Sequence, residues 1–297
     1  MRRLSILLLA FFFHTHSLAQ QQPSYQGLWW NFPAGSESGW GVNITHQGSI
    51  LFATWFTYAA DGSGMWLVMP SMPGAPVYET IEDPYYNYEM FSGWRYSGEI
   101  YRTRGPAWDA AAFDGSQVRA EPVGMASFFF GSMDGGTFEY TLNGVTQSKP
   151  ITRQEFGRMP ACELGGAAGA EPNFQDLWWR SPAGSESGWG LNVAHQGDIV
   201  FATWFTYGAN GTGVWYVLPA GTRTAPRTYS GPLYRTTGPA FDAVPWNGST
   251  VAVTPVGSAS LAFADADNGM FTYTVEGRTS SKAITRQVYS TPKSVCR

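Results

Sequence analysis

The chain has 297 residues, of which 16% are aromatic and only 13% are charged. This length corresponds to about two domains, and the composition excludes a coiled coil, a helical bundle and intrinsic disorder. The 35 glycines and 19 prolines among many β-forming residues favour an all-β protein.

The first residues resemble a targeting segment. Arg2 and Arg3 precede a short apolar run, and small residues end at Ala19, which predicts a signal peptide over residues 1–19. The remaining chain would then be exported, to the periplasm or outside a bacterium. It keeps 16 of the 18 basic residues against 22 acidic ones, a net charge of −6, which disfavours nucleic acid as a partner. No later run is long enough to predict a membrane-spanning segment.

An internal duplication organises the rest of the chain. Residues 33–58 and 182–207 are identical at 21 of 26 positions. A period this long indicates two copies of one domain rather than a solenoid. The predicted domains are copy 1 at residues 20–158 and copy 2 at residues 176–297, joined by a linker at 159–175 that is rich in Gly, Ala and Pro.

Each copy divides into short apolar runs separated by turn residues such as Asn143-Gly144 and Glu276-Gly277. About eight strands per copy predict two tandem antiparallel meanders, each closed into a small barrel, with a β-sandwich as the alternative. The strands predicted in copy 1 lie near 27–31, 40–47, 50–58, 64–70, 96–102, 123–130, 136–143 and 146–156. Those of copy 2 lie near 176–180, 189–196, 199–207, 213–219, 229–235, 256–263, 269–276 and 279–289.

The strand at 50–58 is apolar on both faces. Trp55 lies on one face, while Phe56 and Tyr58 lie on the other. One face would fill a barrel, so the other must be covered or occupied. Packing against the sister copy is favoured, and a ligand surface is the alternative.

Two cysteines, Cys162 and Cys296, lie near the ends of the two copies. An exported protein can form disulfides, so a bond between them is predicted, with two free thiols as the alternative.

Few residues of the mature chain are candidates for catalysis or metal binding. His46 and His195 occupy equivalent positions, each nine residues after Glu37 or Glu186. A buried, structural imidazole is favoured for each, although a Glu–His pair could act as acid and base in a hydrolase. No HExxH motif or Cys/His cluster is present, so no metal, cofactor or catalytic residue is predicted.

Copy 1 carries an insertion at about 78–94 that copy 2 lacks. It holds four carboxylates and six aromatic residues, among them Tyr85, Tyr86, Tyr88 and Trp94. We expect an ordered flap at a barrel mouth with its aromatic side turned inward, either to bind a ligand or as a lid on its own barrel.

The segments ESGWGVNITHQG, ILFATWFTY and GMWLVMP, with their second copies, resemble a repeat of exported bacterial proteins that has no established activity. The match covers nearly all of the mature chain and implies no catalytic residues. The Trp-rich meander is also similar to avidin and lipocalin barrels, in pattern only.

These observations predict a non-enzymatic, exported binding protein. Its ligand would be a carbohydrate or a small molecule with apolar faces. Candidate contacts are Trp40 and Trp189, with the Glu, His and insertion residues named above. The alternatives are a structural or protein-interaction module of the cell envelope and, third, a hydrolase that uses the Glu–His pairs.

Overall fold

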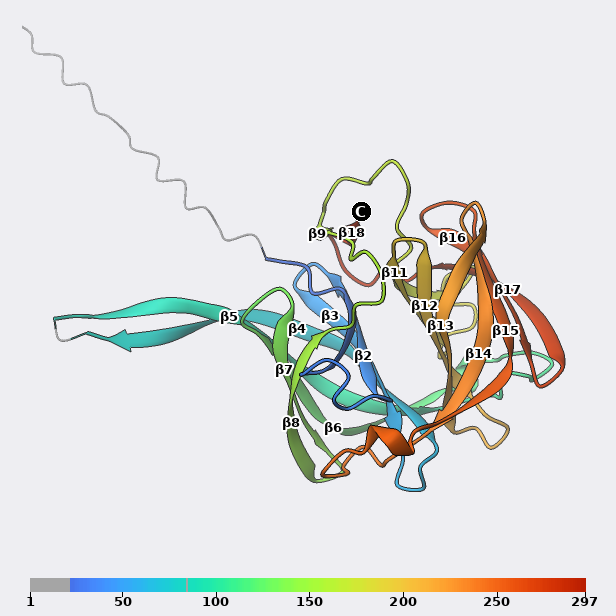
Figure 1. The fold of residues 1–297 in the computed structure, drawn as a ribbon, viewed down its shortest axis with the longest axis horizontal. Helices are drawn as coiled ribbons and strands as arrows, with labels where there is room; N and C mark the ends of the chain where they lie inside the picture. Colours follow the sequence, from blue (N-terminus) through green and yellow to red (C-terminus); the bar gives the residue numbers. More distant parts are fainter. Residues whose placement is uncertain (1–21, 84) are drawn as a thin grey trace, which may run out of the picture.

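The computed structural model describes residues 22–83 and 85–297 (Figure 1). The predicted signal peptide, residues 1–19, lies outside the described residues. The fold is all-β and holds two closed antiparallel barrels of eight strands each, which confirms the predicted class. Among the described residues, no helix has the length and apolar character needed to cross a membrane.

Barrel 1 is an antiparallel meander in which each strand pairs with the next and β8 closes onto β1. A short 3₁₀ turn, η1 (Gly115–Gln117), lies between β5 and β6. The strands of barrel 1 are β1 (Gly27–Asn31), β2 (Gly41–Gln47), β3 (Ile50–Tyr58), β4 (Gly64–Glu82), β5 (Asn87–Arg104), β6 (Arg119–Phe130), β7 (Gly135–Leu142) and β8 (Val145–Arg153).

Barrel 2 repeats this order and closes by pairing β17 with β10. Its 3₁₀ turn is η2 (Gly248–Thr250). The strands of barrel 2 are β10 (Asp176–Arg180), β11 (Gly190–Gln196), β12 (Ile199–Tyr207), β13 (Gly213–Ala225), β14 (Thr228–Thr237), β15 (Ala252–Phe263), β16 (Asn268–Val275) and β17 (Arg278–Arg286).

Turn chemistry sets the register of the hairpins. Asn143 and Gly144 both have positive φ, 50° and 82°, as do Glu276 and Gly277, at 51° and 80°. Two successive residues with positive φ match the right-handed twist of the flanking strands. The two β7–β8-type hairpins therefore close in the same way in both copies.

The interior of barrel 1 is filled by aromatic side chains. Trp55 packs edge-on to Phe138 with ring centroids 5.2 Å apart, and Phe138 stacks on Phe128 at 4.7 Å. Trp29 is fully buried in the same cluster. Barrel 2 has the equivalent arrangement around Trp204. The interior of each barrel is therefore packed with its own aromatic side chains.

The outer faces of the two barrels pack against each other, as the two-faced strand predicts. Phe56 of β3 contacts Trp215 of β13 at 5.5 Å between centroids, and Trp66 of β4 contacts Phe205 of β12 at 5.0 Å. Each tryptophan also donates a hydrogen bond across the interface: Trp66 Nε1 to the Thr206 carbonyl at 2.9 Å, and Trp215 Nε1 to the Thr57 carbonyl at 3.2 Å.

The barrels also exchange loops. Trp108, in the loop after β5, packs against Trp204 and Tyr273 inside barrel 2, at 5.9 and 6.0 Å. Phe241, in the loop after β14, packs against Trp55 inside barrel 1 at 6.1 Å and accepts a hydrogen bond from the Tyr140 hydroxyl at 3.0 Å. Each copy thus supplies an aromatic side chain that completes the core of the other.

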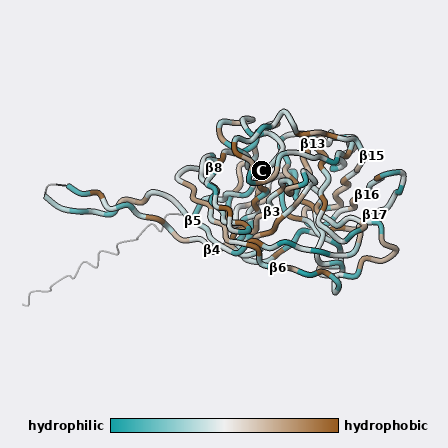
Figure 2. The backbone as a smooth tube through the Cα atoms, turned by 90° about the horizontal axis from the view of Figure 1, so that it is seen from below, coloured by the Kyte–Doolittle hydropathy of each residue, from teal (hydrophilic) through white to brown (hydrophobic). Residues whose placement is uncertain are grey.

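The insertion of copy 1 forms an arm, which we define as residues 74–83 and 85–94, and not the predicted flap. Strands β4 and β5 pair with each other up to Glu82 and Asn87, and both views show the hairpin projecting away from the barrels (Figures 1 and 2). Tyr85 and Tyr86 are 92% and 66% exposed. The prediction of aromatic residues turned into a barrel mouth is therefore wrong, because the ribbon has no surface of its own chain to pack against.

Two short strands clasp the ends of the copies. Strand β9 (Cys162–Leu164), within the predicted linker, pairs with β18 (Ser294–Cys296). The disulfide between Cys162 and Cys296 joins these two strands, which confirms the predicted bond. The clasp ties the end of copy 1 to the end of copy 2.

We expect reduction of this disulfide to destabilise the whole molecule. The bond joins residues 134 positions apart, so the chain-entropy model assigns it about 4–5 kcal/mol. Thermal unfolding with and without reductant measures the change, and the Cys162→Ser/Cys296→Ser variant should match the reduced protein. An unchanged melting temperature in both cases would show that the clasp does not restrain the unfolded chain.

Candidate binding cleft

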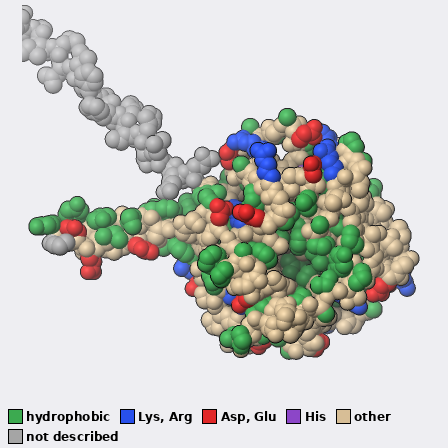
Figure 3. Space-filling model, in the orientation of Figure 1, with side chains coloured by type: hydrophobic (Ala, Val, Ile, Leu, Met, Phe, Trp, Pro, Cys, Tyr) green, Lys and Arg blue, Asp and Glu red, His purple; other side chains and the backbone are tan. Residues whose placement is uncertain are grey.

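A cleft of about 620 Å³ lies between the two barrels. One wall comes from β1, β2 and β3 of barrel 1, and the other from β12, β13 and β14 of barrel 2, with η2 and the start of β15 beside them. In Figure 3, hydrophobic side chains surround a hollow in the middle of this face of the molecule. The cleft adjoins the barrel–barrel contact, because Phe56 and Trp215 belong to both.

Aromatic rings dominate the lining of the cleft. Both copies contribute them, and they come from strands that continue into the barrel–barrel interface. The aromatic lining residues are Trp30, Trp40, Phe56, Tyr58, Phe201, Trp215 and Tyr234. Aliphatic contacts come from Leu28, Val217, Pro219, Val251 and Val253, and polar ones from Ser38, Asn43, Gln154, Thr203 and Thr236.

None of the described residues in this lining carries a charge. The nearest ion pair lies behind Trp40: Glu37 accepts hydrogen bonds from Trp40 Nε1 at 2.9 Å and from Lys149 Nζ at 2.7 Å. The Lys149 ammonium also lies 5.3 Å from the Trp40 ring centroid. This pair orients the Trp40 ring and keeps its own charges compensated, so the cleft itself is suited to an uncharged molecule.

One buried polar atom of the lining residues, Trp30 Nε1, has no hydrogen-bond partner among the described residues. Burial raises the pKa of Tyr58, and a hydrogen bond with the Thr236 side chain opposes that shift. Tyr58 is therefore neutral at physiological pH. Unpaired buried polar groups cost free energy, which a ligand or water that pairs with them would recover.

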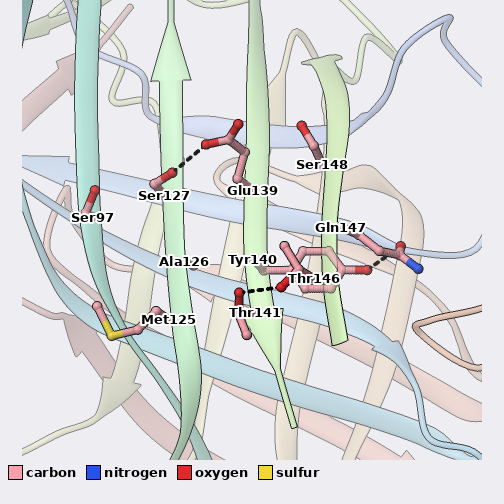
Figure 4. Close-up of a pocket in the computed structure, with 10 residues that line it drawn as sticks. All are labelled: Ser97, Met125, Ala126, Ser127, Glu139, Tyr140, Thr141, Thr146, Gln147 and Ser148. Carbon is pink, nitrogen blue, oxygen red and sulfur yellow. Dashed lines mark hydrogen bonds between the residues drawn. The ribbon is translucent and has the colours of Figure 1, made fainter. Parts of the chain in front are cut away.

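A second depression, on the outer surface of barrel 1, is more open and more polar (Figure 4). It measures about 560 Å³ and crosses strands β5 to β8. Four of its polar side chains are paired with one another: Ser127 donates to Glu139 at 3.2 Å, and the hydroxyls of Thr141 and Thr146 lie 2.8 Å apart. It offers less aromatic surface than the cleft, so it is the weaker candidate.

The two histidines are structural in their contacts. His46 Nδ1 accepts a hydrogen bond from the Tyr25 backbone amide at 3.2 Å, and His195 Nδ1 accepts one from the Phe174 amide at 3.1 Å. The Tyr229 hydroxyl lies 3.0 Å from His195 Nε2. Burial lowers the pKa of His46 to about 3 and that of His195 to about 4, so both are neutral at physiological pH.

The structure does not bring the predicted Glu–His pairs together. Glu37 precedes β2 and is bonded to Trp40 and Lys149, whereas His46 lies at the other end of that strand. In copy 2, Glu186 accepts hydrogen bonds from Trp189 and Lys282 in the same way. The pairing on which the hydrolase alternative depends is therefore wrong, because a seven-residue strand separates its two members.

Of the residues singled out in the sequence, Trp40 lines the cleft and Glu37 supports it from behind. Trp189 and Glu186 repeat that support in barrel 2. Tyr85, Tyr86 and Tyr88 lie on the arm, and Trp94 lies at its base against Phe91. Sequence analysis missed Trp30 and Trp215 as lining residues, although the apolar outer face of β3 was a signal that some outer surface needed an occupant.

No family model, curated protein or solved structure matches the chain. Within residues 22–83 and 85–297, no group of three or more His, Cys, Asp or Glu side chains is placed to hold a metal ion.

The buried histidines predict that stability falls in acid. Unfolding returns each pKa from about 3 or 4 to about 6.5, so the unfolded state binds more protons once the pH drops below about 6.5. Each histidine should lower the free energy of unfolding by about 2 kcal/mol between pH 7 and pH 5.

Denaturant unfolding of the wild type and of the His46→Gln/His195→Gln variant at both pH values measures this effect. The variant should lose most of the pH dependence, whatever its stability at pH 7. An equally steep loss in the variant would mean that other groups cause it.

Proposed function

We propose that this protein is an exported, non-enzymatic binding protein that holds a neutral molecule with apolar faces in the cleft between its barrels. The observation that carries the proposal is the combination of an aromatic lining, the absence of charge among the described lining residues, and an unpaired hydrogen-bond donor, Trp30 Nε1. Ligand sites are commonly apolar clefts with a few polar groups that fix orientation.

Two ligand classes are compatible with this lining. A neutral carbohydrate would stack its ring faces on tryptophan and accept a hydrogen bond from Trp30 Nε1. A flat apolar molecule would use the same rings and leave most polar groups aside. The long aromatic surface supports both, and the lack of charge argues against anionic or cationic ligands.

Export is part of the proposal. The segment over residues 1–19 has the pattern of a signal peptide, and the Cys162–Cys296 disulfide is of a kind that persists in oxidising compartments. Together they favour the periplasm or the outside of a bacterial cell.

Fluorescence titration with two neutral probes, N-phenyl-1-naphthylamine and maltohexaose, tests the proposal. We expect one of them to bind with one site per chain. Trp30→Ala removes a ring and the unpaired Nε1 donor. It should weaken that binding about fivefold if only the aromatic contact of about 1 kcal/mol is lost, and about thirtyfold if a hydrogen bond of about 1 kcal/mol is lost with it.

The internal repeat supplies a matched control. Trp179 is the equivalent residue of copy 2, has an unpaired Nε1 in the same way and does not line this cleft. Trp179→Ala should leave probe binding unchanged. If neither probe binds, or if both variants weaken it equally, the cleft is not the binding site.

A further inference from the structure

The arm is an addition that barrel closure does not require. In barrel 2 the corresponding strands β13 and β14 end at Ala225 and Thr228 with a short turn between them. The barrel 2 sheet nevertheless closes. The arm therefore has no role in completing the fold of copy 1, and its residues must be accounted for in another way.

Large side chains are exposed along the arm. Tyr78, Tyr85, Tyr86, Tyr88 and Met90 are between 45% and 92% exposed. Because Ile81 pairs with Tyr88 and Tyr78 pairs with Phe91 across the ribbon, aromatic residues lie on both of its faces. An exposed apolar surface of this kind is typical of an interaction site.

Along most of the arm, the outer edges of its two strands have no neighbouring strand among the described residues. From Tyr78 to Glu82 and from Asn87 to Phe91, the assigned pairing of β4 and β5 is only with each other. The outer edge of each strand thus has free amide and carbonyl groups. Such edges can pair with a further chain, and charged residues on them select which chain.

The charge of the arm is of one sign. Residues 71–94 include Glu79, Glu82, Asp83 and Glu89 and no lysine or arginine. The first basic residue after it, Arg95, is already paired with Glu139 at 3.1 Å. A second copy of this arm would bring eight carboxylates together, so self-pairing along the edges is opposed by like-charge repulsion.

We propose that the arm is a docking element for a partner protein with an arginine-rich surface. Guanidinium groups can pair with the arm's carboxylates in a bidentate manner and stack on its exposed tyrosine rings. Tyrosine and methionine suit the centre of such a contact and carboxylates suit its rim. This proposal is independent of the cleft.

Binding of a fluorescently labelled octa-arginine peptide to the mature chain, measured by anisotropy at about 50 mM salt, tests the proposal, with octa-lysine in parallel. We expect octa-arginine to bind more tightly, because lysine lacks the planar group that stacks on tyrosine. Tyr85→Ser/Tyr86→Ser/Tyr88→Ser keeps every charge and should weaken octa-arginine binding at least tenfold.

A charge-matched pair of variants separates the arm from the general acidity of the chain. Glu79→Gln/Glu82→Gln/Asp83→Asn/Glu89→Gln should weaken binding at least tenfold. The control neutralises four exposed carboxylates elsewhere: Glu121→Gln, Glu155→Gln, Glu171→Gln and Asp242→Asn. The control should change binding less than threefold.

Equal losses in the two charge variants, or no loss in the tyrosine variant, would overturn the proposal. Sedimentation of the wild type and of a chain lacking residues 79–93 gives a further check. The deletion should leave the melting temperature unchanged, since Pro76 and Trp94 are already cross-strand neighbours. Concentration-dependent dimers that vanish on deletion would show that the occupant is a second copy instead.

Discussion

Phe56 and Trp66 of barrel 1 pack against Phe205 and Trp215 of barrel 2, and each tryptophan donates a hydrogen bond to a backbone carbonyl of the other barrel. Each barrel buries one set of aromatic residues in its interior and carries a second set on its outer face. The second set would be exposed in an isolated barrel, where burial of an aromatic side chain could not contribute its usual ~1.5–3 kcal/mol. Pairing of the barrels is therefore required by the sequence of the strands themselves.

The cleft follows from this contact. Its walls belong to the same outer faces, so its lining continues the aromatic surface of the interface. The exchanged loops fix the geometry further, because Phe241 of copy 2 packs inside barrel 1 and Trp108 of copy 1 packs inside barrel 2. A binding site made in this way depends on both copies, which is a physical reason for a tandem repeat.

Much of the fold could be predicted because its signals are local. Alternating apolar residues and Asn-Gly turns mark the strands and hairpins, and the repeat marks the two barrels. The disulfide could also be predicted, since only two cysteines remain in the mature chain. The cleft could not be predicted, because it joins side chains such as Tyr58 and Trp215 that lie far apart in sequence. The arm was mistaken for a flap because a strand that extends into solvent has the same residue pattern as one that folds back.

The Glu–His pairing failed for a related reason. Glu37 lies in the loop before β2 and His46 lies near the far end of that strand. A seven-residue strand spans about 20 Å, so the two side chains stay at opposite ends of it. Glu37 instead meets Lys149, which follows it by 112 positions. Closure of a barrel by its first and last strands brings such residues together, and local sequence patterns do not record that closure.

Hydrogen exchange of the Phe241→Ala variant tests most directly whether the two barrels are one cooperative unit. Phe241 belongs to the chain of copy 2, yet its ring packs against Trp55 in barrel 1. The account predicts that amides of β3 and β7 in barrel 1 lose protection when this residue is truncated. Loss of protection confined to the loop at 238–251, with barrel 1 unchanged, would contradict it.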